Sequence, residues 1–147
     1  MPAPPTRGAD DIRQLRNALP FWISLLLLPV AWISATVGSW AVLLLPLFGW
    51  GMVTVLDIAG GLDETNPDPQ VSERDLVWYR LITMIWFPIQ FIVVYACLWW
   101  ATHGGMDGTL EKIGLFFGLG VISGTVGIVY SHELLHQRNR VERWLGD

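Results

Sequence analysis

Charged side chains are missing from three long stretches of the chain, and this pattern predicts its secondary structure. No Asp, Glu, Lys or Arg occurs in residues 17–56, 81–106 or 113–132. Because a helix needs roughly 20 apolar residues to span the hydrocarbon core of a bilayer, the first stretch is long enough for two helices and each of the others for one. A small, polar segment at residues 34–39 divides the first stretch into a hairpin. The pattern therefore predicts four transmembrane helices, at residues 19–33, 40–56, 76–100 and 113–130.

The composition agrees with a membrane protein and narrows the class of fold. Apolar residues make up 52% of the chain, only 15% of residues are charged, and the mean hydropathy is +0.44. Together with the helical spans, these values predict an all-α, polytopic transmembrane bundle. No basic patch with interleaved aromatic residues is present, so a nucleic-acid partner is not expected.

The positions of the basic residues predict the orientation of the bundle. Cytoplasmic loops of membrane proteins carry an excess of Lys and Arg. If the N-terminus is cytoplasmic, the four predicted helices place only Lys112 on the outside. Residues 1–16 are then a cytoplasmic tail, and residues 17–147 form a single membrane domain. The basic residues on the inside are Arg7, Arg13, Arg16, Arg74, Arg80, Arg138, Arg140 and Arg143.

A motif with metal-ligand spacing lies where the last predicted helix reaches the cytoplasmic boundary. It reads His132-Glu133-Leu134-Leu135-His136. Residues four positions apart occupy the same face of a helix, one turn apart, so both imidazoles can reach one metal ion. His132 and His136 are therefore candidate metal ligands. They cannot complete a site alone, because a transition metal normally takes three or more protein ligands.

A second distinctive segment connects the second and third predicted helices. It contains Asn66-Pro67 and Asp68-Pro69, where each proline forces the residue before it into an extended conformation. Asp57 stands apart from this turn because it lies at the cytoplasmic end of an apolar helix. A carboxylate in that position is costly unless it is hydrated, paired or hydrogen-bonded.

Together the two segments resemble the membrane-bound alkane hydroxylase family, the alkane 1-monooxygenases. The resemblance covers most of the chain after the first predicted helix, and it reaches only the first part of a full family member. Family members have six membrane helices and carry further histidine boxes that this sequence does not contain. The matching residues are Leu56-Asp57, Gly61, Asp63, Asn66-Pro67 and Tyr79-Arg80 in one stretch, and the pentad with Glu142-Arg143-Trp144 in the other.

The resemblance implies a non-haem di-iron centre that uses O2 to hydroxylate the terminal carbon of an alkane. By matching position, His132 and His136 are its first histidine box and two of its iron ligands. One residue along a helix rotates by about 100°, so Glu133 is expected to orient an imidazole through a hydrogen bond instead of binding the metal. Asp57 is expected to support the ligands in the same way.

The resemblance also implies a setting and partners. Electrons come in this family from a rubredoxin that is fed by a flavin reductase. The protein is expected to be a multi-pass component of the cell inner membrane, surrounded by lipid, with its site facing the cytoplasm. Because the chain holds one histidine box, residues 17–147 are expected to be the N-terminal part of a truncated hydroxylase domain that is inactive alone.

The second predicted helix offers a candidate substrate channel. Gly49 and Trp50 lie about two turns before Asp57, in a run of large apolar residues. In the related hydroxylases a bulky side chain near this point accompanies shorter substrates, so a glycine would leave a long alkane room to extend. The alternative is that Gly49 only allows close approach of neighbouring helices, as small residues do in membranes.

Two other interpretations use the same pentad. His-Glu-x-x-His is also the zinc-protease signature, with the glutamate as general base, and intramembrane proteases carry it within a membrane helix. Against a protease, no partner motif follows, and His103, the only other histidine, is predicted on the opposite side of the membrane. The third interpretation is a non-catalytic membrane fragment in which the pentad occurs by chance.

Overall fold

The structure, a computed structural model, describes residues 7–60 and 76–147, and every regular element in these two ranges is a helix. The predicted all-α class is confirmed. The Asn-Pro and Asp-Pro segment at residues 66–69 lies outside the described residues. The elements are α1 (Arg7–Ile23), η1 (Ser24–Leu26), α2 (Leu27–Val37), η2 (Ser39–Leu43), α3 (Leu44–Gly60), α4 (Val77–Thr102), α5 (Thr109–Ile122), the π-helix η3 (Ser123–Gly127), α6 (Ile128–Leu135) and α7 (Arg140–Gly146).

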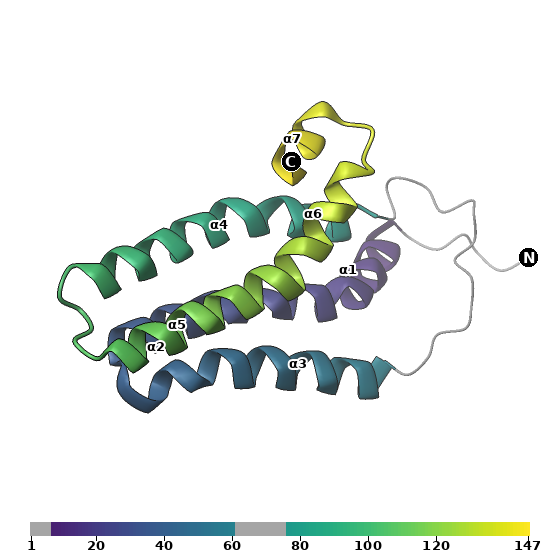
Figure 1. The fold of residues 1–147 in the computed structure, drawn as a ribbon. Coiled ribbons are helices and arrows are strands. Elements are labelled where there is room, and N and C mark those ends of the chain that lie inside the picture. The colour runs from purple at the N-terminus through teal and green to yellow at the C-terminus, as the bar shows by residue number, and fades with distance from the viewer. Residues whose placement is uncertain (1–6, 61–75) are drawn as a thin grey trace, which may run out of the picture.

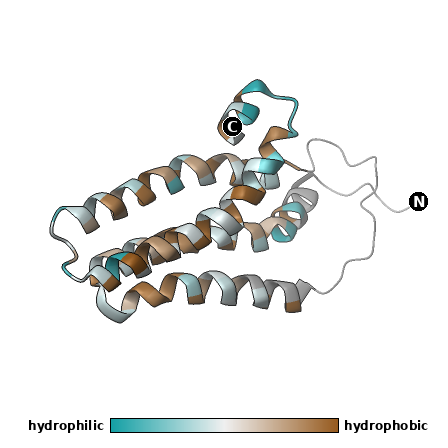
Figure 2. Ribbon diagram, in the orientation of Figure 1, coloured by the Kyte–Doolittle hydropathy of each residue, from teal (hydrophilic) through white to brown (hydrophobic). Residues whose placement is uncertain are grey.

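The long helices lie side by side in an antiparallel bundle (Figure 1). Helix α2 packs against α3, α4 and α5, and α7 folds back against α6 and α4. The α2–α3 turn and the α4–α5 connection lie at one end, the loop end. The start of α4, the end of α6 and α7 lie at the other, the histidine end. Hydrophilic residues gather at the turn between α6 and α7, whereas the middle of the helices is mostly hydrophobic (Figure 2).

Three helical segments are long and apolar enough to cross a membrane. They are Gln14–Val37, Val77–Thr102 and Thr109–Leu135, and they correspond to the first, third and fourth predicted crossings. The second predicted crossing falls in η2 and α3, where the apolar helix found among the described residues is the shorter segment Ser39–Met52. A fourth crossing, and a total of six in a complete family member, therefore remain predictions.

The first helix begins earlier than predicted, at Arg7, inside the segment expected to be a tail. Residues 9–19 contain neither Pro nor Gly, so nothing in their backbone chemistry ends the helix there. Hydropathy locates only the apolar part of a helix, while its backbone hydrogen bonds continue into polar residues. Residues 7–16 are therefore helical, and their assignment to a cytoplasmic tail remains a prediction.

Two local features bend the first hairpin. Gly38 has φ +63° and Ser39 has φ +50°, a left-handed conformation that ends α2. This confirms the predicted break at residues 34–39. Pro29 lacks an N–H and its ring clashes with the carbonyl four residues earlier, which is that of Leu25. The 3₁₀ turn η1 lies at Leu25 and replaces the α-helical bonding there.

Close packing of η2 and α3 on α5 depends on two glycines spaced four residues apart. A Cβ on Gly114 would lie 2.7 Å from Val42 Cγ2, and one on Gly118 would lie 2.9 Å from Leu45 Cβ. Any side chain at these positions would force the helices apart. The sequence Gly114-Leu-Phe-Phe-Gly118 is thus a small-residue packing motif of the kind that joins membrane helices.

Candidate metal centre

The two histidines of the pentad converge at the histidine end of the bundle. His132 lies in the last turn of α6 and His136 is the residue that follows the helix. Their Nε2 atoms are 3.2 Å apart, and the ring planes are inclined at 77°. Imidazole nitrogens bind first-row metals at about 2.1 Å, so two ligands on one ion at angles near 90–110° lie roughly 3.0–3.4 Å apart. The separation fits two adjacent positions around one metal ion.

The described residues supply part of a metal site. They contain no group of three or more His, Cys, Asp and Glu side chains that could hold a metal ion. Two imidazoles suit iron, zinc and copper alike, so this donor set alone does not select the metal. Asp57 lies in α3, but its side chain is outside the described part of the structure, and its supporting role remains a prediction.

Glu133 is engaged with a neighbour on its own helix. Its Oε1 accepts a hydrogen bond of 2.8 Å from Gln137 Nε2. The carboxylate therefore meets the carboxamide one turn later, and the bonds described for Glu133 do not include one to either imidazole. The hydrogen bond to an imidazole that the sequence predicts is not tested by this arrangement and remains a prediction.

Helix α6 is held in the bundle just before the first histidine. The hydroxyl of Tyr130 donates to the carbonyl of Phe21 at 3.1 Å and lies 3.0 Å from Ser24 Oγ. Its ring meets that of Trp86 edge-to-face at a centroid distance of 5.7 Å. Tyr130 thus joins α6 to α1 and α4. These contacts fix the position of α6 along the bundle two residues before His132.

A cavity of about 550 Å3 opens beside His132. Its lining is contributed by α1, α4 and α6, and it is mainly apolar and aromatic. Sequence reasoning missed these residues because each is an ordinary apolar or aromatic position of a membrane helix, and only the packing of three helices brings them together. The apolar and aromatic members of this lining are Phe21, Leu76, Tyr79, Ile128, Val129 and Tyr130.

Gly49 and Trp50 lie away from this cavity. Gly49 is buried, and a Cβ on it would lie 3.6 Å from Val121 and 3.8 Å from Leu27. Trp50 is 54% exposed and meets the ring of Phe117 edge-to-face. Neither residue lines a cavity described for residues 7–60 and 76–147. The surroundings of Gly49 favour the close-approach alternative, although its role in substrate length is not tested.

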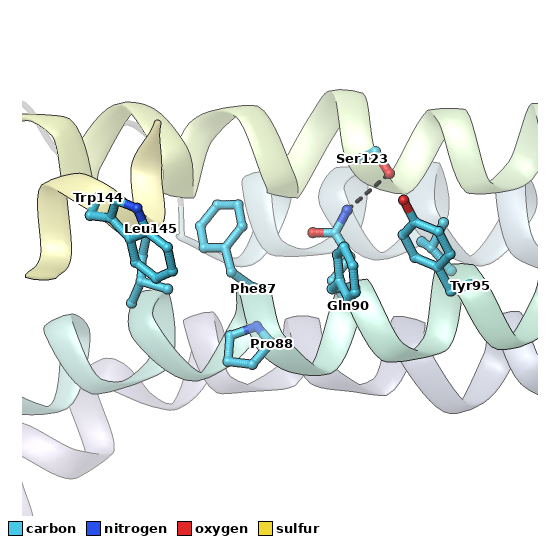
Figure 3. A pocket seen from close by; sticks show the side chains of 9 residues that line it. Phe87, Pro88, Gln90, Tyr95, Ser123, Trp144 and Leu145 are labelled. Atoms are coloured by element: carbon cyan, nitrogen blue, oxygen red, sulfur yellow. Dashed lines mark hydrogen bonds between the residues drawn. The ribbon is translucent and has the colours of Figure 1, made fainter.

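A separate cavity of about 460 Å3 lies along α4 and η3 and reaches α7 (Figure 3). Gln90 of α4 connects α4 to η3 beside this cavity. Its Oε1 accepts from Trp86 Nε1, and its Nε2 donates to Ser123 Oγ at 2.9 Å. A carboxamide inside an apolar bundle is costly without such partners. None of the predicted site residues lines this cavity, so we assign Gln90 a structural role.

His103 is the residue that follows α4, and α4 ends at the loop end, at the opposite end of the bundle from α7 (Figure 1). Its ring stacks on Trp99 with a centroid distance of 4.9 Å, and Nδ1 lies 3.0 Å from the Trp99 carbonyl oxygen. Within this fold His103 therefore cannot join the pair as a third ligand. This agrees with the sequence analysis, which placed it at the opposite end of the membrane helices.

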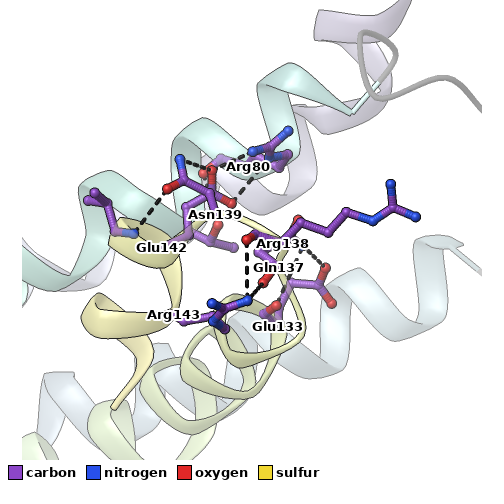
Figure 4. A network of polar contacts seen from close by, with 9 residues as sticks. Arg80, Glu133, Gln137, Arg138, Asn139, Glu142 and Arg143 are labelled. Atoms are coloured by element: carbon purple, nitrogen blue, oxygen red, sulfur yellow. Dashed lines mark hydrogen bonds and ion pairs between the residues drawn. The ribbon is translucent and has the colours of Figure 1, made fainter.

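The turn after His136 is held by a polar network (Figure 4). Arg80 of α4 donates from Nε and Nη2 to the two carboxylate oxygens of Glu142 on α7. Asn139 caps α7 by accepting from Val141 N at 3.0 Å, and its Nδ2 donates to Glu142 Oε1. The network thus connects α4 with the segment that leads out of the pentad.

The fold and site define a helical bundle with at least three membrane-length apolar helices and a histidine pair at one end. No family model matches the chain, and no solved structure matches it. Relatives with curated names do match. The chain is 34% identical over 143 residues to alkane 1-monooxygenase 2 of Alcanivorax borkumensis, which covers 87% of this chain and 35% of that protein.

Two proteins of Pseudomonas aeruginosa give the same result. Alkane 1-monooxygenase 1 is 32% identical over 121 residues, covering 77% of this chain and 30% of that protein. Alkane 1-monooxygenase 2 is 26% identical over 100 residues, covering 66% and 26%. The resemblance to the membrane-bound alkane hydroxylases is confirmed, and this chain is a relative of that family. It spans between about a quarter and a third of the length of these curated relatives.

Proposed function

We propose that this chain forms the part of a membrane-bound alkane hydroxylase that contributes two iron ligands and a wall of the alkane cavity. One observation carries the proposal: two imidazole nitrogens 3.2 Å apart stand at the end of a membrane-length helix, beside a cavity of about 550 Å3 lined mainly by apolar residues. The names of the three relatives support the reaction class.

In this proposal the chain's residues have three tasks. His132 and His136 present imidazole nitrogens to one metal position. Phe21, Ile128 and Val129 bound the cavity next to His132, where they would hold a hydrocarbon chain and exclude water, because an alkane offers no polar group to recognise. Tyr130 holds α6 in place against α1 and α4, so that His132 stays beside the cavity. A non-haem di-iron centre, when bound, would supply the O2 chemistry for inserting oxygen into the terminal C–H bond.

The remaining parts of the proposal concern the setting. The other metal ligands would come from further histidine boxes of a complete hydroxylase. Electrons would arrive from a rubredoxin-type donor and its reductase, with O2 and an alkane as substrates. The histidine end would face the cytoplasm in the cell inner membrane, since eight of the nine basic residues lie on that side of the predicted topology.

The relatives favour this function over the zinc-protease interpretation, because all three are named as monooxygenases. The same relatives argue against a chance pentad in a non-catalytic protein.

The test uses a complete hydroxylase that contains this chain. His132→Ala and His136→Ala are each expected to lower bound iron, measured by mass spectrometry, and to reduce the alcohol formed from an alkane at least a hundredfold. The matched control is His103→Ala, at the loop end, which should keep both values within twofold of wild type. Stoichiometric zinc with peptide cleavage, or unchanged iron and alcohol in both pentad variants, would refute the proposal.

A further inference from the structure

A buried carboxylate joins α7 to the rest of the bundle. Glu142 is 2% exposed, and it is the one buried charged side chain among those that the structure describes. Its two oxygens face Arg80, whose Nε donates to Oε2 at 3.3 Å while Nη2 donates to Oε1. A buried charge is costly unless a partner compensates it. Glu142 therefore stays buried only while α7 lies against the start of α4.

The same short helix holds the turn that follows the second histidine. Arg143 Nη1 donates to the carbonyl oxygens of Gln137 and Arg138, at 3.3 and 3.2 Å. Asn139 caps α7 and also donates to Glu142. The three residues immediately after His136 are thus all bonded to side chains or backbone of α7.

The far end of α7 closes on α6 with little room to shift. Ser131 Oγ donates to the carbonyl of Gly146. A Cβ on Gly146 would lie 2.8 Å from the backbone oxygen of Ser131 and 3.0 Å from Leu134 Cβ. The C-terminal end of α7 is therefore held against α6 by Gly146, while its N-terminal end is tied to α4 through Glu142 and Arg80.

We propose that Glu142 is a positioning residue for the histidine pair, and that its ion pair with Arg80 keeps His136 over His132. The physical reason is that the last turn of a helix frays because its carbonyls lack partners within the helix, and His136 lies just past the end of α6. Ligands hold a metal tightly only when their supporting contacts fix them beforehand. The claim that the two histidines bind iron rests on the proposed function. The claim that α7 holds the turn after His136 in place, which we call the clamp, does not.

The clamp is tested on the 147-residue chain in lipid nanodiscs, with Cu(II)–iminodiacetate as the probe for two histidines one turn apart. Affinity is measured by titration, and pulsed electron paramagnetic resonance counts the coordinated imidazoles. Glu142→Gln is expected to weaken binding at least fivefold, to reduce the fraction of two-imidazole copper, and to speed amide hydrogen exchange at residues 136–139. Arg140→Gln, an exposed position on the same helix, should change affinity less than twofold.

A second variant keeps the test decisive if Glu142→Gln fails to fold. Arg80→Lys keeps a cation beside the buried carboxylate but cannot donate from two nitrogens of one planar group to its two oxygens, so it should also speed exchange at residues 136–139 and weaken copper binding. Wild-type affinity and exchange in a folded Glu142→Gln or Arg80→Lys chain would overturn the inference. Because copper binding requires no hydroxylation, a complete enzyme without iron or activity would refute the proposed function and leave this result standing.

Discussion

Gly118 of α5 and Leu45 of α3 approach so closely that a Cβ on the glycine would lie 2.9 Å from the Cβ of the leucine. Leu45 is completely buried, and the contact joins the first turn of α3 to α5. Since α5 runs on through η3 into α6, this packing also supports the rod that carries the histidines.

The first prediction concerns this contact. Gly118→Leu should lower the free energy of unfolding by about 1–3 kcal/mol, because extra atoms in a packed core force backbone shifts. The measurement is denaturant or thermal unfolding of the chain in detergent. Gly120→Leu is the matched control, since a Cβ there meets nothing within 4 Å. Equal stability of the two variants would contradict the packing described.

The second prediction concerns the hydroxyl that holds α6 to α1. Tyr130→Phe removes the bond to the Phe21 carbonyl and the contact with Ser24 while keeping the ring against Trp86. We expect a loss of about 1 kcal/mol in unfolding free energy, the typical net value of one such bond, and faster hydrogen exchange in α6. Tyr95→Phe, at a side chain that is 58% exposed, should change neither quantity.

The third prediction separates the two places where an alkane could lie. In a complete hydroxylase, Val129→Trp narrows the cavity beside His132, so activity on long alkanes should fall more than activity on short ones. Gly49→Trp should instead reduce activity equally at all lengths, because the new ring would press on Val121 and Leu27 and disturb the packing. The assay is alcohol yield across a series of alkanes.

Two controls complete that experiment. Val37→Trp places a tryptophan at an exposed position at the loop end, and Gly51→Trp places one on α3 where a Cβ meets nothing within 4 Å. Both should retain the wild-type profile. If Gly49→Trp alone lost activity selectively on long alkanes, the substrate channel would lie along α3, as the sequence analysis proposed.

The fourth prediction concerns orientation. In a Cys97→Ala background, a membrane-impermeant thiol reagent added to intact cells should label Asp107→Cys at the loop end. It should miss Arg140→Cys on α7 until the membrane is opened. Both positions are exposed, so access and not burial decides the outcome. The reverse pattern would place the histidine end outside the cell and contradict the distribution of basic residues.

The helices were predictable from the sequence because charges are so costly in hydrocarbon that their absence marks a crossing. Residues 76–100 and 113–130 correspond to α4 and to the rod from α5 to α6, with ends that differ by several residues. The ends were less predictable, since polar residues at a membrane boundary remain in the helix as long as their backbone hydrogen bonds do. The start at Arg7 is the clearest example.

The candidate site divides in the same way. The spacing of His132 and His136 determined their convergence, because two residues four apart on a helix are brought together by the helix's own hydrogen bonds. The burial of Gly49 and the cavity beside His132 were not accessible by that reasoning. Each depends on which helix packs against which, and apolar residues facing lipid or a neighbour look alike in a sequence.

By itself, then, the sequence determined the all-helical class, the apolar spans and the histidine pair, all of which follow from local chemistry within one helix. Only the tertiary structure decided that Arg80 meets Glu142, 62 residues further along the chain, and that α1, α4 and α6 enclose a cavity. The physical reason is that pairings between helices are selected by packing across the whole bundle. The partner of a buried charge such as Glu142, or of a glycine such as Gly118, is known only when the helix that packs against it is known.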